Sequence, residues 1–183
     1  MATKISRRGF AQVEPNHLSG IVTGQILAQL PVDTATMGKV IENGRFAKYD
    51  YANNKVNLTG EGEWMLIYNE EKLYDERYQS HKDFAMIAEN YDGEEIYPRL
   101  ISTVLGDIFT TNAFGLGSTN KAEVEGIELE EGDKVAINSS TGYLDKVGGD
   151  ADGDLDKEGP TFQVVKVYTM ADMQPGVKLM RIK

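Results

Sequence analysis

The residues best suited to chemistry form one acidic run, from Asp150 to Glu158, in which aspartates alternate with other residues. Carboxylates spaced in this way can converge on a hard cation such as Ca²⁺. The run does not fit the calcium loop of EF-hand proteins, because Leu155 and Thr161 stand where that loop has glycine and glutamate. We favour a solvated acidic loop over an ion site. The candidate calcium ligands are Asp150, Asp152, Asp154 and Asp156.

Other residues capable of acid–base or nucleophilic chemistry do not form a set that suggests catalysis. The chain has two histidines, His17 and His81, and no cysteine. Ser80, His81 and Asp83 are close in sequence, but a catalytic triad depends on convergence in space. No carboxylate pair stands out among 29 acidic residues as the machinery of a glycosidase. We therefore predict that the protein is not an enzyme and uses no cofactor.

Composition and charge argue against several classes of protein. The lack of cysteine removes disulfides and thiolate metal sites. No apolar run approaches the roughly 18 residues that a membrane helix needs. A net charge of −10 disfavours binding to nucleic acid, which is itself an anion. The N-terminal segment has no apolar stretch typical of a secretion signal, so we expect synthesis and folding in a cytoplasm.

The elements that would position these residues are mostly β-strands. Short runs of β-branched and aromatic residues are separated by turn residues, among them 19 glycines. The strands are predicted at 45–51, 63–68, 83–88, 96–104, 107–111, 134–138, 143–147, 161–169 and 176–182. The best candidate for a helix is 69–80, which an ordered loop would explain equally well.

The chain is predicted to form one β domain, residues 36–183, preceded by an extended N-terminal arm, residues 1–35. The arm contains few large apolar residues, and Pro15 and Pro31 interrupt it. It could lie on its own domain or on a neighbouring subunit. A tyrosine-rich insertion at about residues 69–98 is predicted to face a partner, because tyrosines are common at protein interfaces.

Two segments repeat one pattern of turn residues around a strand. Each begins with an acidic stretch that ends in glycine, at Ile41–Gly44 and at Leu129–Gly132. The repeat aligns Gly44 with Gly132, Asp50 with Asn138, Asn54 with Gly142 and Val56 with Leu144. It predicts a tight turn, a strand, an Asx-type turn and a return strand. The pattern indicates an interrupted small barrel, two similar β modules, or turn chemistry common to any β protein.

Several of these segments resemble small virion structural proteins of tailed bacteriophages, in particular capsid decoration (cement) proteins. The resemblance rests on Glu42–Asp50, Gly132–Ile137 and the closing strand Phe162–Val167, and it covers about half of the chain. It implies a small β-barrel or β-tulip-like domain that binds the major capsid protein lattice and stabilises the head. The insertion at 69–98 departs from the compact members of that group.

The resemblance also implies partners and a location. The partners would be the major capsid protein and copies of the chain itself, in a homo-oligomer such as a trimer, without nucleic acid or membrane. The location would be the exterior of the capsid, with residues 1–35 docked on capsid subunits or on a neighbouring copy. Two alternatives stay open: another head–tail or tail structural protein, and a carbohydrate-binding β module.

Overall fold

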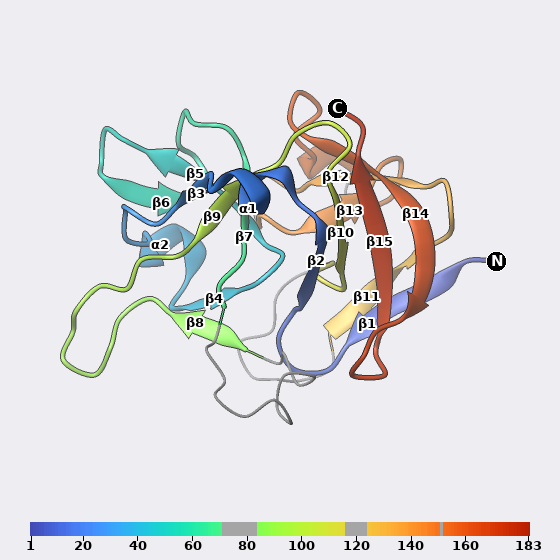
Figure 1. Cartoon of the computed structure of the whole chain (residues 1–183), viewed down its shortest axis with the longest axis horizontal. Coiled ribbons are helices and arrows are strands. Elements are labelled where there is room, and N and C mark those ends of the chain that lie inside the picture. Colours follow the sequence, from blue (N-terminus) through green and yellow to red (C-terminus); the bar gives the residue numbers. More distant parts are fainter. Residues whose placement is uncertain (71–83, 116–123, 151) are drawn as a thin grey trace.

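A computed structural model describes residues 1–70, 84–115, 124–150 and 152–183, and these form mostly antiparallel β-strands (Figure 1). The predicted mostly-β class is therefore confirmed. The strands are β1 Thr3–Arg7, β2 Val13–His17, β3 Ile26–Leu27, β4 Val40–Glu42, β5 Phe46–Asp50, β6 Lys55–Asn57, β7 Met65–Ile67, β8 Ala85–Ile87, β9 Leu100–Ser102, β10 Ile108–Thr111, β11 Val124–Leu129, β12 Lys134–Ile137, β13 Leu144–Lys146, β14 Thr161–Thr169 and β15 Pro175–Arg181. The helices are α1 Ser19–Thr23, α2 Thr34–Met37 and a 3₁₀ turn at Asp152–Asp154. The helix predicted at 69–80 falls mostly outside the described residues.

The strands form two large sheets and two ribbons. One sheet has the order β13-β12-β14-β15-β10-β2, and the other has the order β6-β5-β7-β9-β3. The ribbons pair β1 with β11 and β4 with β8. Within the described residues these sheets remain open, so the small closed barrel expected from the sequence is not found.

The two large sheets repeat one arrangement of strands. The order β6-β5-β7-β9-β3 corresponds strand for strand to β13-β12-β14-β15-β10, and β2 is an addition at one edge. The residues that pair across neighbouring strands correspond as well. Across the five-stranded sheet, one row of paired residues is Ile26, Ile101, Leu66 and Phe46. The corresponding row across the six-stranded sheet is Ile108, Met180, Gln163 and Lys134. We call β3–β7 with β9 the first module, and β10–β15 the second module. The interpretation as two similar β modules is therefore the one that the structure supports.

The glycine pattern seen in the sequence begins the same turn in both modules. Gly44 has φ +84° and donates its N–H to the carbonyl of Ile67 at 3.0 Å, while Gly132 has φ +94° and donates to Val164 at 2.9 Å. Ile67 and Val164 are themselves equivalent, because they directly follow the equivalent residues Leu66 in β7 and Gln163 in β14. A positive φ strains a residue with a Cβ, which explains glycine at both positions.

The hairpins that follow these turns also match. Tyr49 pairs with Val56 in the first module, and Ile137 pairs with Leu144 in the second, as the sequence alignment requires. Each return strand receives one isolated parallel bridge from upstream, Val32 to Val56 and Phe114 to Leu144. The predicted Asx turns are present, because the side chains of Asp50 and Asn138 accept backbone N–H groups from Asn53 and Ser140.

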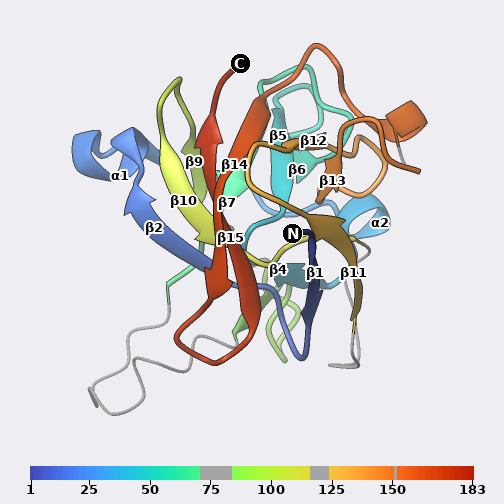
Figure 2. The ribbon, with the colours of Figure 1, turned by 90° about the vertical axis from the view of Figure 1, so that its right-hand side faces the viewer.

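Residues 1–35 do not extend away from the β domain as an arm. Figure 2 shows β1 beside β11 and β2 beside β10, and β3 pairs with β9. Ile5, Val13 and Leu18 are buried in the common core. Pro15 is tolerated because β2 is an edge strand, where a missing N–H breaks no ladder. Although large apolar residues are few in this segment, enough of them point inward to hold it on its own domain.

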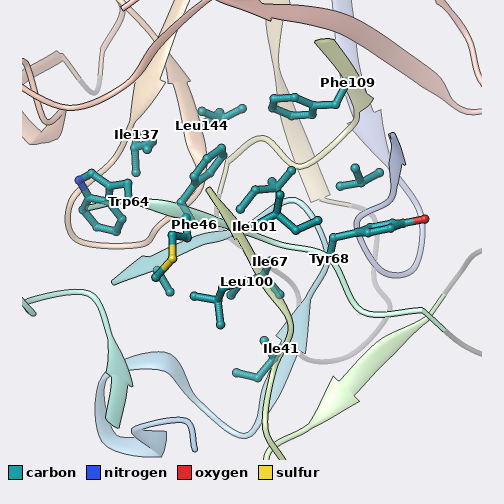
Figure 3. Packing of buried hydrophobic residues seen from close by; sticks show 14 of the residues in the cluster. Ile41, Phe46, Trp64, Ile67, Tyr68, Leu100, Ile101, Phe109, Ile137 and Leu144 are labelled. Carbon is teal, nitrogen blue, oxygen red and sulfur yellow. The ribbon is translucent and has the colours of Figure 1, made fainter. Parts of the chain in front are cut away.

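One hydrophobic core joins the two modules (Figure 3). Phe46 of the first module packs on Phe109 and Phe162 of the second, with ring centroids 6.4 and 5.5 Å away. Trp64 is only 3 % exposed and belongs to the same core. Because the modules share this core, close packing there resists movement of one module against the other.

Candidate functional site

The modules differ most in the connection between two equivalent strand pairs. In the second module residues 170–174 join β14 to β15, whereas in the first module residues 68–99 join β7 to β9. The longer connection contributes β8, which pairs with β4. After β8 the chain runs out from the sheets before it returns to β9, at the lower left of Figure 1. We call residues 87–98 the projecting loop; they form part of the insertion predicted at 69–98.

Local hydrogen bonds define the shape of the projecting loop. The side-chain oxygen of Asn90 accepts the N–H groups of Asp92 at 3.0 Å and Glu94 at 2.9 Å. Gly93 has φ +79° at the tip, and Ile96 donates its N–H to Ala88 at 2.8 Å. Ile96 also packs against the core. The loop is therefore anchored at its base and closed by an Asx turn at its tip.

The surface of the projecting loop is both aromatic and acidic. Tyr91 is fully exposed, while Tyr97 is 50 % and Ile87 is 49 % exposed. Residues 84–98 include four acids and neither lysine nor arginine. Two of these acids lie near lysines from neighbouring segments: Glu89 is 3.8 Å from Lys39, and Glu95 forms an ion pair with Lys55. Asp92 and Glu94 carry the negative charge at the tip.

A pocket of about 280 Å³ lies where the two modules meet. Gly62 and Gly159 line it at equivalent places, since each stands four positions before the equivalent residues Leu66 and Gln163. The full lining is Lys48, Gly62, Glu63, Trp64, Asp156, Glu158, Gly159, Pro160, Arg181 and Lys183. The pocket is thus built from both modules and carries both signs of charge.

Trp64 forms a fixed wall of this pocket. Its Nε1 donates to the carboxylate of Asp156 at 2.7 Å, and the Lys48 ammonium lies 4.6 Å from its ring centroid. This hydrogen bond lowers the pKa of Asp156 the most, and the N–H groups of Glu158 and Gly159 lower it further against the opposing effect of burial. The carboxylate therefore stays ionised at neutral pH. Because Lys48 already covers the indole ring, that face is not presented to a sugar, and the carbohydrate-binding alternative gains no support here.

A buried polar network connects the N-terminal strand to both modules. Arg7 donates to the Glu42 carboxylate at 2.9 Å and to the carbonyl of Phe114 at 2.8 Å, and the Tyr143 hydroxyl donates to Glu42 at 2.6 Å. Burial raises the pKa of Tyr143 well above its usual range, and the charge of Glu42 raises it further. Burial lowers the pKa of Arg45, whose guanidinium also faces the Tyr143 ring. Arg7, Glu42 and Tyr143 each form at least one hydrogen bond in the network, although Arg7 Nε and Glu42 Oε1 are buried without one. We interpret the network as a fastening between segments.

Two of the aspartates proposed as calcium ligands, Asp152 and Asp156, form other contacts. Asp152 accepts the N–H of Gly148 and pairs with Lys157 at 3.0 Å, while Asp156 turns to Trp64. Within the described ranges, no three His, Cys, Asp or Glu side chains are arranged to hold a metal ion. The four carboxylates of Asp150, Asp152, Asp154 and Asp156 are therefore not gathered around one point.

The remaining sequence candidates are placed only in part. His17 is exposed at the end of β2, and Ser80, His81 and Asp83 lie outside the described residues. Among the residues that are described, no helix has the length and apolar character to cross a membrane. The Arg7–Glu42 contact was not predicted from the sequence. The available signal was Arg7 itself, a charged residue in a segment where every second residue from Ile5 is otherwise small or apolar.

Comparisons of the chain with protein-family models, with curated proteins and with solved structures found no match.

Proposed function

We propose that the protein is a virion structural protein of a tailed bacteriophage, a decoration protein that binds the major capsid protein lattice and stabilises the head. One observation carries this proposal. Two of the three segments on which the resemblance rests, Glu42–Asp50 and Gly132–Ile137, occupy equivalent places in two β modules. These modules share one hydrophobic core and so form one folded body.

Such a body suits a protein that reinforces a shell. A pre-formed β structure has little conformational entropy to lose when it docks. Repeated copies on a symmetric lattice add avidity to weak single contacts. The net charge of −10 favours solubility before assembly. Because residues 1–35 lie in the sheets of their own domain, docking in this proposal uses the folded surface and not a free arm.

The test is a binding measurement with undecorated phage heads. The mass of the purified protein in solution gives its oligomeric state, and titration into heads gives the number of bound copies. A decoration protein should saturate at on the order of hundreds of copies and raise the temperature at which heads open. Saturation at a few to a few dozen copies would instead identify a head–tail or tail component. The absence of any binding to heads would contradict both.

A further inference from the structure

We propose that the projecting loop, residues 87–98, is the surface through which this protein binds its partner, and that the partner offers a positively charged protein surface with an apolar recess. The inference rests on the proposed function for the partner's identity as the capsid lattice. The identification of the loop as the binding surface does not depend on that function.

The comparison between modules indicates that the projecting part of the loop is not needed to close the fold. The second module joins the equivalent strands β14 and β15 through residues 170–174 alone. In the first module β8 adds a strand beside β4, but the chain beyond it leaves the sheets (Figure 1). Tyr91 at the tip is fully exposed and adds nothing to the core. A role outside the domain explains this extra chain better than a role in folding.

The side chains that the loop presents are those that contribute most at protein interfaces. Tyrosine offers a large, stiff and partly polar surface, and Tyr91, Tyr97 and Ile87 are each exposed. The Asx turn at Asn90 holds the tip in shape before any partner arrives. Ordering costs on binding are therefore small, which favours affinity. An apolar recess on the partner would bury the tyrosine rings.

The charge of the loop defines the other half of the partner's chemistry. Lys39 and Lys55 lie near Glu89 and Glu95 at the base, but Asp92 and Glu94 are at the tip, in a segment without lysine or arginine. Acidic groups around an aromatic anchor favour a basic surface and speed the encounter with it. An acidic partner, or a second copy docking through the same loop, would bring like charges together.

The first experiment measures the affinity of the full chain for undecorated heads. Tyr91→Ala and Tyr97→Ala should each weaken binding by about tenfold or more, as expected for aromatic anchors. Met173→Ala is the matched control, because Met173 is 81 % exposed on the corresponding turn of the second module. Asp92→Asn should lower the association rate and reduce its dependence on salt. Circular dichroism would verify that each variant is folded.

The second experiment locates the covered surface directly. Since the chain has no cysteine, Tyr91→Cys and Met173→Cys each introduce a single thiol. Binding to heads should slow the labelling of the thiol at position 91 and leave that at position 173 unchanged. Binding of the wild type with equal labelling at both positions would overturn the loop proposal and leave the proposed function standing. If the wild type does not bind heads, both the loop proposal and the proposed function are overturned. If the thiol at position 91 becomes protected in the free protein as its concentration rises, the loop binds a second copy of the chain instead of the capsid.

Discussion

The guanidinium of Arg7 lies 2.9 Å from the carboxylate of Glu42, and both side chains are almost completely buried. The contact joins β1, at the start of the chain, to β4 of the first module. A second amine of the same guanidinium donates to the carbonyl of Phe114, in the second module. One side chain therefore holds three parts of the chain together.

Replacing Arg7 should destabilise the protein strongly. Arg7→Ala leaves the Glu42 carboxylate buried without its cation, and the free energy of unfolding should fall by about 3–5 kcal/mol. Arg8→Ala removes an exposed neighbour and should change it by no more than about 0.5 kcal/mol. Urea denaturation measures both. A loss for Arg7→Ala no larger than that for Arg8→Ala would mean that the ion pair does not hold the N-terminal strand.

The buried hydroxyl of Tyr143 should make stability depend on alkaline pH. The pKa of Tyr143 is raised in the folded protein, mainly by burial, so the folded state favours the neutral phenol. Its contribution is complete below the unfolded pKa of about 10 and is lost as the pH rises above that value. Urea titrations at increasing pH should show this loss, and Tyr143→Phe should make the decline shallower. Tyr49, Tyr68 and Tyr168 also have raised pKa values, so a residual slope is expected.

Replacement by alanine should reduce the stability of the protein more at Gly44, which precedes β5, than at Gly132, which precedes β12. At Gly132 an added Cβ meets nothing within 4 Å, so Gly132→Ala should cost only the strain of a positive φ, about 1–2 kcal/mol. At Gly44 the same atom would lie 2.5 Å from the Cβ of Ala113, which adds about 1–3 kcal/mol for overpacking. Equal losses in thermal or urea unfolding would show that the two modules are not packed differently at this turn.

Both hairpins contain a side-chain hydrogen bond between an asparagine and an aspartate, with the two residue types at exchanged positions. In the first module Asn57 donates to Asp50 at 2.9 Å, and in the second Asn138 donates to Asp145 at 3.1 Å, so acid and amide exchange places. Asn57→Asp alone sets two carboxylates against each other and should destabilise the first hairpin. Asp50→Asn together with Asn57→Asp reproduces the arrangement of the second module and should recover most of the loss. Urea midpoints of the two variants make the comparison, and a double variant no more stable than Asn57→Asp would refute the equivalence of the two contacts.

The sequence alone was sufficient for the features that depend on neighbouring residues. Strand positions such as 161–169 follow from runs of β-branched and aromatic residues, and β14 occupies that range. The turns at Gly44 and Gly132 and the Asx turns at Asp50 and Asn138 follow from local backbone and side-chain chemistry. The repeated pattern therefore identified both hairpins correctly.

Only the tertiary structure decided the position of residues 1–35, the open edges of the sheets formed by the described strands, and the directions of the Asp152 and Asp156 carboxylates. Each depends on contacts between segments far apart in the chain, such as Ile5 with Ile127 or Trp64 with Asp156. Pairings of this kind are selected by the packing of the whole domain, since many alternative partners are equally compatible with the local sequence. Local residue patterns specify what each segment can form, and burial in a shared core selects which segments meet.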